Sequence, residues 1–465
     1  MCPSPLLARI GYLQQGGVEA TQLAPQKIKQ KNKGTPMSSP SPWMCAIDFG
    51  TSNSLVTVAS REKVENPLIV DPAGEDPTVM RSVLFTRGKQ FGWNFGTEAI
   101  EQYTEWAPAG RLLRSLKKHL PDSMFLGTQI EGVSYTIIDL IAVFLRHFRQ
   151  LASTHCDQDV SRVVLGRPAI FSTNPEEDKL AEQRLTAAAQ MAGFTEVHFL
   201  AEPLAAAYEF RRSLSSKKKV LIADFGGGTS DFTVLELGPD RFRKEDVLAI
   251  GGISRAGDAI DGSLMQHKIS RHFGSEVTYQ HPLGRNALHM PRSLLKKLCS
   301  PADIAFLAQR ESLSFFQDVE RWAPLPEDKK SVQQLMVLVE ERLGYPIFRA
   351  IEDTKKALSQ TDTHLFRFEY PGIQIAEYVS QSEFFQASTN VVEEIFSACD
   401  ATMKQAQLQF SDIDIVCCTG GTAKYPAVIR ELANRFGAEK LSAYQHFHSI
   451  IRGLGDRAQA ILFES

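Results

Sequence analysis

The sequence is poor in the features that mark membrane, disulfide-linked or zinc-binding proteins. No apolar run approaches the length that crosses a bilayer, and the first 42 residues lack the apolar core of a signal peptide. The seven cysteines form no C-x-x-C pair, and the adjacent Cys417 and Cys418 sit in an apolar run that favours a buried strand. We therefore expect a protein of the reducing cytoplasm, without a membrane partner.

The sequence also lacks a basic surplus and the common phosphate-binding motifs. Its 51 Lys and Arg against 54 Asp and Glu give a net charge of −3, which argues against a nucleic-acid partner because no excess cations are available to displace counterions. It contains no Walker A sequence. Asp-Phe-Gly occurs twice, but without the His-Arg-Asp loop or the glycine-rich loop and strand lysine of protein kinases. The sequence thus excludes the P-loop and protein-kinase classes.

A polar segment precedes the first strand-like residues. Residues 1–43 contain a Gln/Lys-rich stretch and then a Pro/Ser-rich stretch, a composition typical of a disordered leader. Met37 lies shortly before the first expected strand, so the sequence leaves open whether translation starts at Met1 or at Met37.

Two segments have the pattern of a strand, a tight turn and a returning strand. Residues 44–49 and 54–59 flank a turn of small hydroxyl residues, and residues 220–225 and 232–237 flank a glycine-rich turn. The sequence Asp-Phe-Gly leads into both turns. We interpret the two segments as a diverged internal duplication, with each copy opening one lobe.

Strands and helices alternate along the rest of the chain, which predicts an α/β fold. We expect lobe I at 44–219 and lobe II at 220–465, with an enlarged subdomain at about 271–344, where the patterns are weak. The pattern predicts helices at 134–151, 175–192, 199–210, 254–269, 348–360, 382–410 and 458–463, and strands at 162–166, 366–375 and 413–419.

The glycine-rich turn carries the strongest chemical signal. Consecutive glycines remove side chains, so backbone N–H groups can approach phosphate oxygens, and a threonine adds a hydroxyl donor. The flanking aspartates would repel phosphate unless a cation lies between them, and Mg²⁺ prefers carboxylates, phosphate and water. A plain hairpin turn is the weaker explanation. The residues are Asp224, Gly226, Gly227, Gly228, Thr229 and Asp231.

The first turn has a composition that is generic by itself. Paired with the glycine-rich turn, it predicts phosphate contacts from the opposite lobe. Its residues are Asp48, Gly50, Thr51, Ser52 and Asn53.

These segments resemble the ATPase domain of DnaK-type heat-shock chaperones. The two turns look like the family's phosphate loops, and Ala-Glu-Pro-Leu-Ala-Ala-Ala at 201–207 is similar to its connecting segment. Residues 352–359 are similar to the helix that covers adenine and ribose, and residues 419–426 to the adenosine loop, with Lys424 where arginine is usual. The resemblance implies the actin-like ATPase fold, in which two duplicated RNase H-like lobes surround a nucleotide cleft.

The same resemblance implies catalytic and metal-binding roles. Hydrated Mg²⁺ would be held, mostly through water, by Asp48, Glu202, Asp224 and Asp231. One of the last two aspartates would polarise the attacking water, and Thr229 would lie beside the γ-phosphate. Lys117 resembles the family's catalytic lysine, which stabilises charge on the transferred phosphoryl group, although a solvated lysine fits its spacing nearly as well.

The resemblance also implies how ATP or ADP is held. Glu352, Lys355, Lys356 and Ser359 share one helical face at spacings i, i+3, i+4 and i+7, which suits a wall for base and ribose. The remaining expected contacts are Gly257, Asp258, Gly420, Gly421, Thr422 and Lys424. Pro168 resembles the family's switch proline between the lobes, and ending a strand explains it equally well.

The sequence departs from DnaK-type chaperones in ways that affect function. It stops after the expected last helix of the ATPase, so we expect no peptide-binding domain, as in the short YegD-like heat-shock-related proteins. Phe447 stands where the family has an aspartate. We expect an ATP-binding and ATP-hydrolysing chaperone-like protein that works with Mg²⁺ and acts through protein partners or cochaperones.

Three alternatives stay open at this point. A small-molecule kinase or phosphatase of the same superfold would use residues 271–344 to bind its substrate, and fold alone does not decide between these activities. A filament-forming protein of the actin or MreB kind is the second alternative, although no self-complementary surface is evident. The third is a nucleotide sensor with negligible turnover, against which the retained acidic residues argue.

Overall fold

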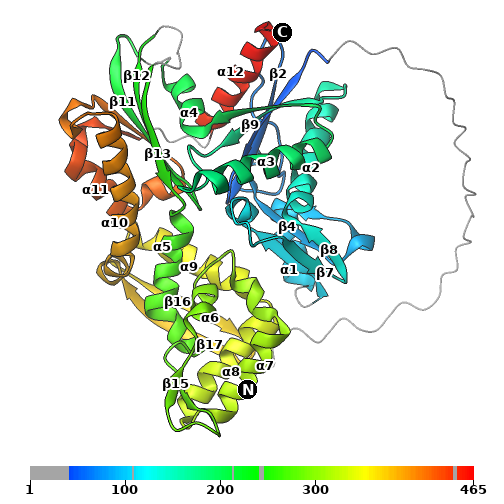
Figure 1. Ribbon diagram of the computed structural model, residues 1–465, viewed down its shortest axis with the longest axis vertical. Coiled ribbons are helices and arrows are strands. Elements are labelled where there is room, and N and C mark those ends of the chain that lie inside the picture. Colours follow the sequence, from blue (N-terminus) through cyan, green and yellow to red (C-terminus); the bar gives the residue numbers. More distant parts are fainter. Residues whose placement is uncertain (1–40, 107–108, 212–213, 240–245, 444–447, 465) are drawn as a thin grey trace, which may run out of the picture. The chain divides into compact units, whose positions relative to one another are not determined.

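The computed structural model describes residues 41–106, 109–211, 214–239, 246–443 and 448–464 (Figure 1). These residues belong to one compact unit that begins at Ser41. Most of the expected leader, the alternative start at Met37, and Phe447 lie outside the described residues. None of the helices in the described part of the chain is long and apolar enough to span a bilayer.

The first half of the described chain is built on a mixed five-stranded sheet. β1 pairs in parallel with β9 and antiparallel with β2, and the outer neighbours continue these directions. In spatial order the strands are β10 (Glu196–Ala201), β9 (Arg162–Arg167), β1 (Met44–Phe49), β2 (Asn53–Ala59) and β3 (Met80–Arg81).

A second five-stranded sheet, also counted within the described residues, repeats this topology. β11 pairs antiparallel with β12 and in parallel with β18, and each outer strand again continues the direction of its neighbour. In the same spatial order the strands are β19 (Leu441–Ala443), β18 (Ile415–Thr419), β11 (Lys218–Phe225), β12 (Ser230–Leu237) and β13 (Val247–Ile253). The repeated strand order confirms the predicted duplication and α/β class.

Alternation along the central strands assigns their two faces to different cores. In β1, Cys45, Ile47 and Phe49 pack with α2 (Ile137–Cys156) and α3 (Pro175–Met191), because side chains of a strand point alternately to opposite faces. Met44 and Ala46 point the other way, into a core shared with the second sheet. In β11, Val220 and Ile222 join that shared core, whereas Leu221, Ala223 and Phe225 pack with the helices of the second half.

Two helices fill the core that the sheets share. α4 (Glu202–Phe210) and α12 (His448–Glu464) pack against each other, and both contact strands of the first sheet (Figure 1). Gly453 of α12 comes so close to Ala205 that a Cβ on the glycine would lie 1.9 Å from the Ala205 carbonyl oxygen. The last helix of the proposed lobe II therefore packs on the sheet of lobe I.

Short elements surround the edge of the first sheet. A three-stranded sheet is followed by a 3₁₀ helix, η3, which carries Lys117, and by a small hairpin. In chain order these elements are β4 (Val83–Thr86), η1 (Lys89–Phe91), β5 (Asn94–Phe95), α1 (Gly96–Trp106), β6 (Arg111–Arg114), η3 (Leu116–His119), β7 (Gly127–Ile130) and β8 (Val133–Thr136).

The region with weak sequence patterns is mainly helical and packs on the second sheet's core. After β13 come α5 (Gly257–Leu264), η6 (Met265–Ile269), η7 (Ser270–Phe273), β14 (Thr278–Gln280), β15 (Ala287–His289), α6 (Arg292–Leu298), η8 (Ile304–Ala308), α7 (Arg310–Trp322) and α8 (Pro326–Glu340). The chain continues through α9 (Gly344–Leu358), β16 (Thr363–Tyr370), β17 (Ile373–Ser380), α10 (Gln381–Gln405), η9 (Phe410–Asp412), η10 (Gly421–Lys424), α11 (Pro426–Phe436) and η11 (Ala438–Lys440).

Several expected elements differ from the structure. The helix expected at 199–210 begins only at Glu202, because residues 199–201 belong to β10, and the helix expected at 382–410 ends at Gln405.

The strand expected at 366–375 is a hairpin, because Pro371 and Gly372 form its turn and Gly372 adopts φ +87°, a conformation that favours glycine. The short last helix expected at 458–463 is the longer α12, whose Gly453 and Gly455 permit close packing rather than ending the helix.

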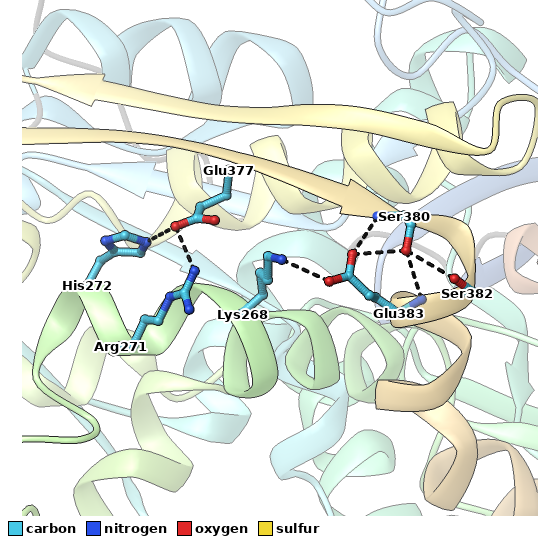
Figure 2. Close-up of polar contacts among 7 residues, drawn as sticks. All are labelled: Lys268, Arg271, His272, Glu377, Ser380, Ser382 and Glu383. Carbon is cyan, nitrogen blue, oxygen red and sulfur yellow. Dashed lines mark hydrogen bonds and ion pairs between the residues drawn. The ribbon is translucent and has the colours of Figure 1, made fainter.

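Two carboxylates attach the β16–β17 hairpin and α10 to the preceding short helices (Figure 2). Glu377 of β17 accepts hydrogen bonds from Arg271 at 2.8 Å and His272 at 2.9 Å. Glu383 of α10 pairs with Lys268 at 3.0 Å and also belongs to the capping box of α10, in which it and Ser380 accept each other's backbone N–H.

We expect Ser380→Ala to lower the free energy of unfolding by about 1 kcal/mol, because the N–H of Glu383 loses its capping oxygen. Urea unfolding followed by circular dichroism measures the change. Ser397→Ala, within the same helix, is the control and should be neutral or slightly stabilising, since alanine is the better helix former. Equal midpoints for Ser380→Ala and wild type would contradict the capping role.

Candidate functional site

The two sequence-predicted turns have the same backbone geometry. In the first hairpin, the N–H of Gly50 donates to the Asn53 carbonyl at 3.0 Å. In the second, the N–H of Gly226 donates to the Thr229 carbonyl at 2.9 Å. In both hairpins the bond runs from the glycine after the first strand to the residue three positions later, so the two turns are equivalent parts of the duplicated unit.

The tips of the two turns lie directly against each other. A Cβ atom added to Gly227 would lie 2.0 Å from the Ser52 Oγ, and one added to Gly228 would lie 2.9 Å from the Thr51 Oγ1. The absence of side chains at both glycines therefore allows the hydroxyl residues of the first turn to approach the backbone of the second. This contact unites the sequence-predicted phosphate residues of both lobes.

Two further loops close on the second turn. The N–H of Asp258 donates to the Gly227 carbonyl at 2.7 Å, and the N–H of Gly257 donates to the Gly226 carbonyl at 3.3 Å. From the other side, the Thr422 hydroxyl donates to the Gly226 carbonyl at 2.8 Å. The structure thus brings together residues that the sequence reasoning had only carried over by resemblance.

Gly420 shows why this loop needs glycine. It adopts φ +83°, and an added Cβ would lie 2.2 Å from the Phe225 carbonyl oxygen and 3.0 Å from the Asp224 Oδ1. Both the backbone conformation and the lack of space exclude a larger residue. Gly421 follows at the start of η10, and Lys424 at its end has an exposed side chain.

Behind the turns, carboxylates gather at the ends of the central strands. Asp48 is the second-last residue of β1, and Asp224 is the second-last residue of β11. Asp231, the second residue of β12, pairs with Asp224 across the hairpin. Glu202 begins α4, and its carboxylate pairs with the Lys117 ammonium at 2.5 Å. All five side chains are buried; those of Lys117 and Glu202 are 5% and 8% exposed.

Asp231 is incompletely hydrogen-bonded. Its Oδ1 accepts the backbone N–H of Ala169 at 2.8 Å, and hydrogen bonding by the Thr229 side chain to the same carboxylate opposes the rise that burial causes in its pKa. The buried Oδ2 of Asp231 has no partner of ordinary hydrogen-bond geometry among the described residues. Pro168 directly follows the last residue of β9 and directly precedes Ala169, so its role in ending the strand is confirmed. Its role as a switch between the lobes stays a prediction. A buried carboxylate oxygen without a donor is costly unless a ligand, ion or proton satisfies it.

Burial and repulsion between carboxylates raise the pKa of all three aspartates of this cluster. Burial, followed by the charge of Glu202, raises the pKa of Asp224 to about 6, although the Thr419 hydroxyl and Lys117 oppose this effect. The same two causes raise the pKa of Asp48 and of Asp231 well above the ordinary range. A single ammonium from Lys117 therefore does not balance the negative charge of the described cluster.

The helix expected to cover the nucleotide forms an ion-pair network. Lys355 of α9 pairs with Asp261 of α5 at 2.6 Å, and Lys356 pairs with Glu352 at 2.8 Å. Burial alone would raise the pKa of Glu352, but hydrogen bonding and ion pairing with Lys356, with further cationic neighbours, lower it to about 2. Ser359 is exposed and donates back to the Lys355 carbonyl at 3.1 Å.

Several residues at this site were not identified from the sequence. Arg81 of β3 pairs with Glu352 at 3.7 Å, and Ser115 donates to Asp258 at 3.2 Å. Thr419 donates to Asp224 at 2.7 Å. A hydroxyl at the end of an apolar strand next to Gly420 could have indicated Thr419, whereas the other two contacts join segments whose proximity no local pattern reveals.

The carboxylates of the described site are the side chains that could face a cation. No three His, Cys, Asp or Glu side chains among the described residues lie close enough to hold one metal ion directly. A cation with its own water ligands would nevertheless stabilise the charged form of the buried aspartates of this cluster, whose pKa values are raised. Its water ligands could also donate hydrogen bonds to the Asp231 Oδ2.

The family model described as Hsp70 protein matches residues 88–306 and 329–453, more than half of the chain. The chain therefore belongs to the Hsp70 family, and its duplicated sheets form the actin-like ATPase fold of that family. It contains a chaperone-type ATPase domain of a family whose members bind ATP or ADP with Mg²⁺.

The limits of the match are informative. It begins after the first hairpin, so the position of Thr51 and Ser52 opposite the second turn comes from the geometry and not from the match. Between its two segments it omits residues 307–328, which contain α7 and the beginning of α8.

We expect Asp224→Asn to stabilise the protein above about pH 6 when nucleotide and divalent cations are absent. The raised pKa of Asp224 means that the folded state holds a proton that the unfolded state has released, so wild-type stability falls as pH rises from about 4 to about 6. The neutral amide avoids this cost, by at most about 3 kcal/mol.

Thermal unfolding at about pH 4 and about pH 7.5 checks the pH dependence of this difference. The exposed Asp353→Asn on α9 is the matched control. A variant less stable than wild type at the higher pH would show that Asp224 is not held in an unfavourable charged state.

Proposed function

We propose that this chain binds Mg·ATP between its two opposed turns and hydrolyses it. The observation that carries the proposal is the direct apposition of Thr51 and Ser52 with Gly227 and Gly228 in front of buried carboxylates. The glycine backbone of the second turn and the hydroxyls of Thr51 and Ser52 are groups that suit the oxygens of a polyphosphate. The carboxylates suit the cation that such a polyphosphate requires.

The proposed division of roles follows the chemistry of each group. Asp48, Glu202, Asp224 and Asp231 would hold Mg²⁺ mostly through water. The bound ion would neutralise phosphate charge. The free Oδ2 of Asp231 is available to accept a proton or hydrogen bond from an attacking water, which favours Asp231 over Asp224, whose Oδ1 is already engaged by Thr419.

Lys117 is proposed to stabilise charge on the transferred phosphoryl group. Its buried ion pair with Glu202 argues against a merely solvated lysine. A buried ammonium held by one carboxylate is fixed in position, and it retains further N–H donors for a phosphate oxygen.

The base and ribose are proposed to lie against α9 and the loop after β18. Support comes from the convergence of Asp258 and Thr422 on the second turn, and from Lys355, which reaches across to Asp261. Glu352, Lys356, Ser359, Gly421 and Lys424 remain proposed contacts of this wall. The exposed side chains of Lys356, Ser359 and Lys424 have the least structural support.

Family membership favours a chaperone-type ATPase over a small-molecule kinase, a phosphatase or a filament former. Within that class, we propose action through protein partners such as cochaperones, a cytoplasmic location and a resemblance to YegD-like members. ATP turnover that appears only with a small phosphoryl acceptor would instead support the kinase alternative.

We expect Asp231→Ala to lower Mg²⁺-dependent ATP turnover at least about tenfold, which corresponds to about 1.4 kcal/mol in the barrier. The carboxylate is fully buried beside the second turn, so alanine removes its negative charge without a substitute. Thr229→Val should also reduce turnover, because valine keeps the side chain's size and removes the hydroxyl.

Phosphate release by the purified protein measures these effects. Asp318→Ala, a partly exposed aspartate on α7 away from the turns, is the matched control, and Thr229→Ser should restore part of the activity. Wild-type activity in both Asp231→Ala and Thr229→Val would refute the catalytic assignment.

A further inference from the structure

A cavity of about 70 Å³ lies apart from the two turns, between β6 and η3 on one side and η8, α8 and α9 on the other. Its walls are mainly apolar, with Leu112, Leu113, Leu116, Leu140 and Ile304 among the lining side chains. Several lining residues come from the region whose role the sequence left open. The volume of the cavity is below that of pockets for drug-sized ligands, so a ligand of this cavity must be a compact molecule with few non-hydrogen atoms.

The polar groups of this cavity are positively charged or neutral. Arg111, Arg114 and Arg342 line it, together with His119 and Tyr103, and no Asp or Glu is among the described lining residues. Arg114 lies 3.9 Å from Asp258 and over the ring of Tyr345. The other two arginines have no ion pair within the described chain, so their positive charge is not balanced locally.

Arg111 has a buried hydrogen-bond donor without a partner in the described part of the chain. Its Nε is inaccessible to solvent and has no hydrogen-bond partner among the described residues. Burial, and then the nearby charge of Arg342, lower the pKa of Arg111. Both guanidinium groups also act on the buried hydroxyl of Tyr103, which places all three around the same space. Two unpaired like charges beside an apolar wall cost stability unless an anion joins them.

The backbone conformation at Arg342 favours a residue other than arginine. Arg342 follows the end of α8 with φ +56°, where glycine or asparagine is favoured. The N–H of Arg342 donates to the Val339 carbonyl at 3.2 Å, as at many helix ends, and glycine would do the same without strain. Arginine at this position therefore supplies a guanidinium at a conformational cost.

We propose that this cavity binds a small organic anion, a carboxylate or phosphate attached to a compact apolar group, through Arg111 and Arg342. The guanidinium groups pair with the anionic end, and the tyrosine hydroxyl of Tyr103 donates a further hydrogen bond. The leucine-rich wall receives the apolar end. The site is separate from the proposed ATP contacts, although Leu116, in its wall, directly precedes Lys117.

Calorimetric titration of the full chain, without nucleotide or divalent cations, tests this site with four compact probes: methyl phosphate, propionate, neutral propionamide and inorganic phosphate. We expect one or both organic anions to bind more tightly than propionamide and inorganic phosphate. Preference between the two anions identifies the ligand as a phosphate ester or a carboxylate. No heat from either anion at millimolar concentration, or equal affinity for all probes, would overturn the proposal.

Variants assign the binding to the cavity. Arg342→Asn, which suits the backbone conformation, and Arg111→Met should each weaken anion binding about tenfold or more, because each removes a charged hydrogen-bond donor. Arg310→Asn, on the surface of α7, is the control and should bind as wild type does. Unchanged affinity in both cavity variants would overturn the proposal, and thermal unfolding verifies that Arg342→Asn folds.

A reciprocal comparison separates this site from the proposed ATP site. Gly228→Ala, which crowds Thr51, should weaken Mg·ATP binding and leave anion binding unchanged, whereas Arg342→Asn should do the reverse. Loss of anion binding in Gly228→Ala would place the probe between the turns and overturn the cavity assignment. Failure of Mg·ATP to bind wild type would count against the proposed function alone.

Discussion

An excess of buried negative charge controls the site. Four carboxylates end or begin the elements behind the two turns, and Lys117 is the ammonium that the described structure places among them. Water cannot screen them, so their repulsion and desolvation appear as raised pKa values of Asp48, Asp224 and Asp231. The same unfavourable arrangement gives the site its proposed affinity for a cation. A bound cation would offset the repulsion and desolvation of the carboxylates, which remain unfavourable in the folded protein.

The duplicated sheet explains why these charges meet at one place. Each sheet has a central strand that ends in Asp-Phe and is followed by glycine, and the two copies share a core filled by α4 and α12. That core fixes the carboxyl ends of β1 and β11 close to each other, and the glycines at the tips let the turns touch. The fold thus positions two equivalent turns, while the residues that differ between them, a hydroxyl pair and a glycine pair, make the contact possible.

The sequence was most informative where backbone chemistry is local. Both hairpins, their turns and the α/β class follow from strand patterns interrupted by glycine and hydroxyl residues, and the observed strand ends lie within two residues of the expected ones. The β16–β17 turn was missed although Pro371 and Gly372 signal it, because apolar residues on both sides resemble one strand. The length of α12 was underestimated since its glycines serve helix packing.

Contacts between distant segments could not be predicted from local patterns. The Lys117–Glu202 pair, the Ala169 N–H on Asp231 and the Arg81–Glu352 pair each join residues that only the fold brings together. Resemblance supplied Lys117 and Glu202 as separate candidates, but not their ion pair. The unpaired arginines of the cavity were invisible for the same reason: a missing partner is a property of three-dimensional surroundings and not of spacing.

Proton release on binding tests the central claim most directly. Calorimetry of Mg·ATP binding at about pH 6, repeated in buffers of different ionisation enthalpy, counts the protons exchanged. The account predicts net proton release with Mg·ATP and less or none with ATP alone, because the cation favours the charged carboxylates. Binding that is independent of Mg²⁺, or that releases no protons, would contradict the proposal that the buried carboxylates form the cation site.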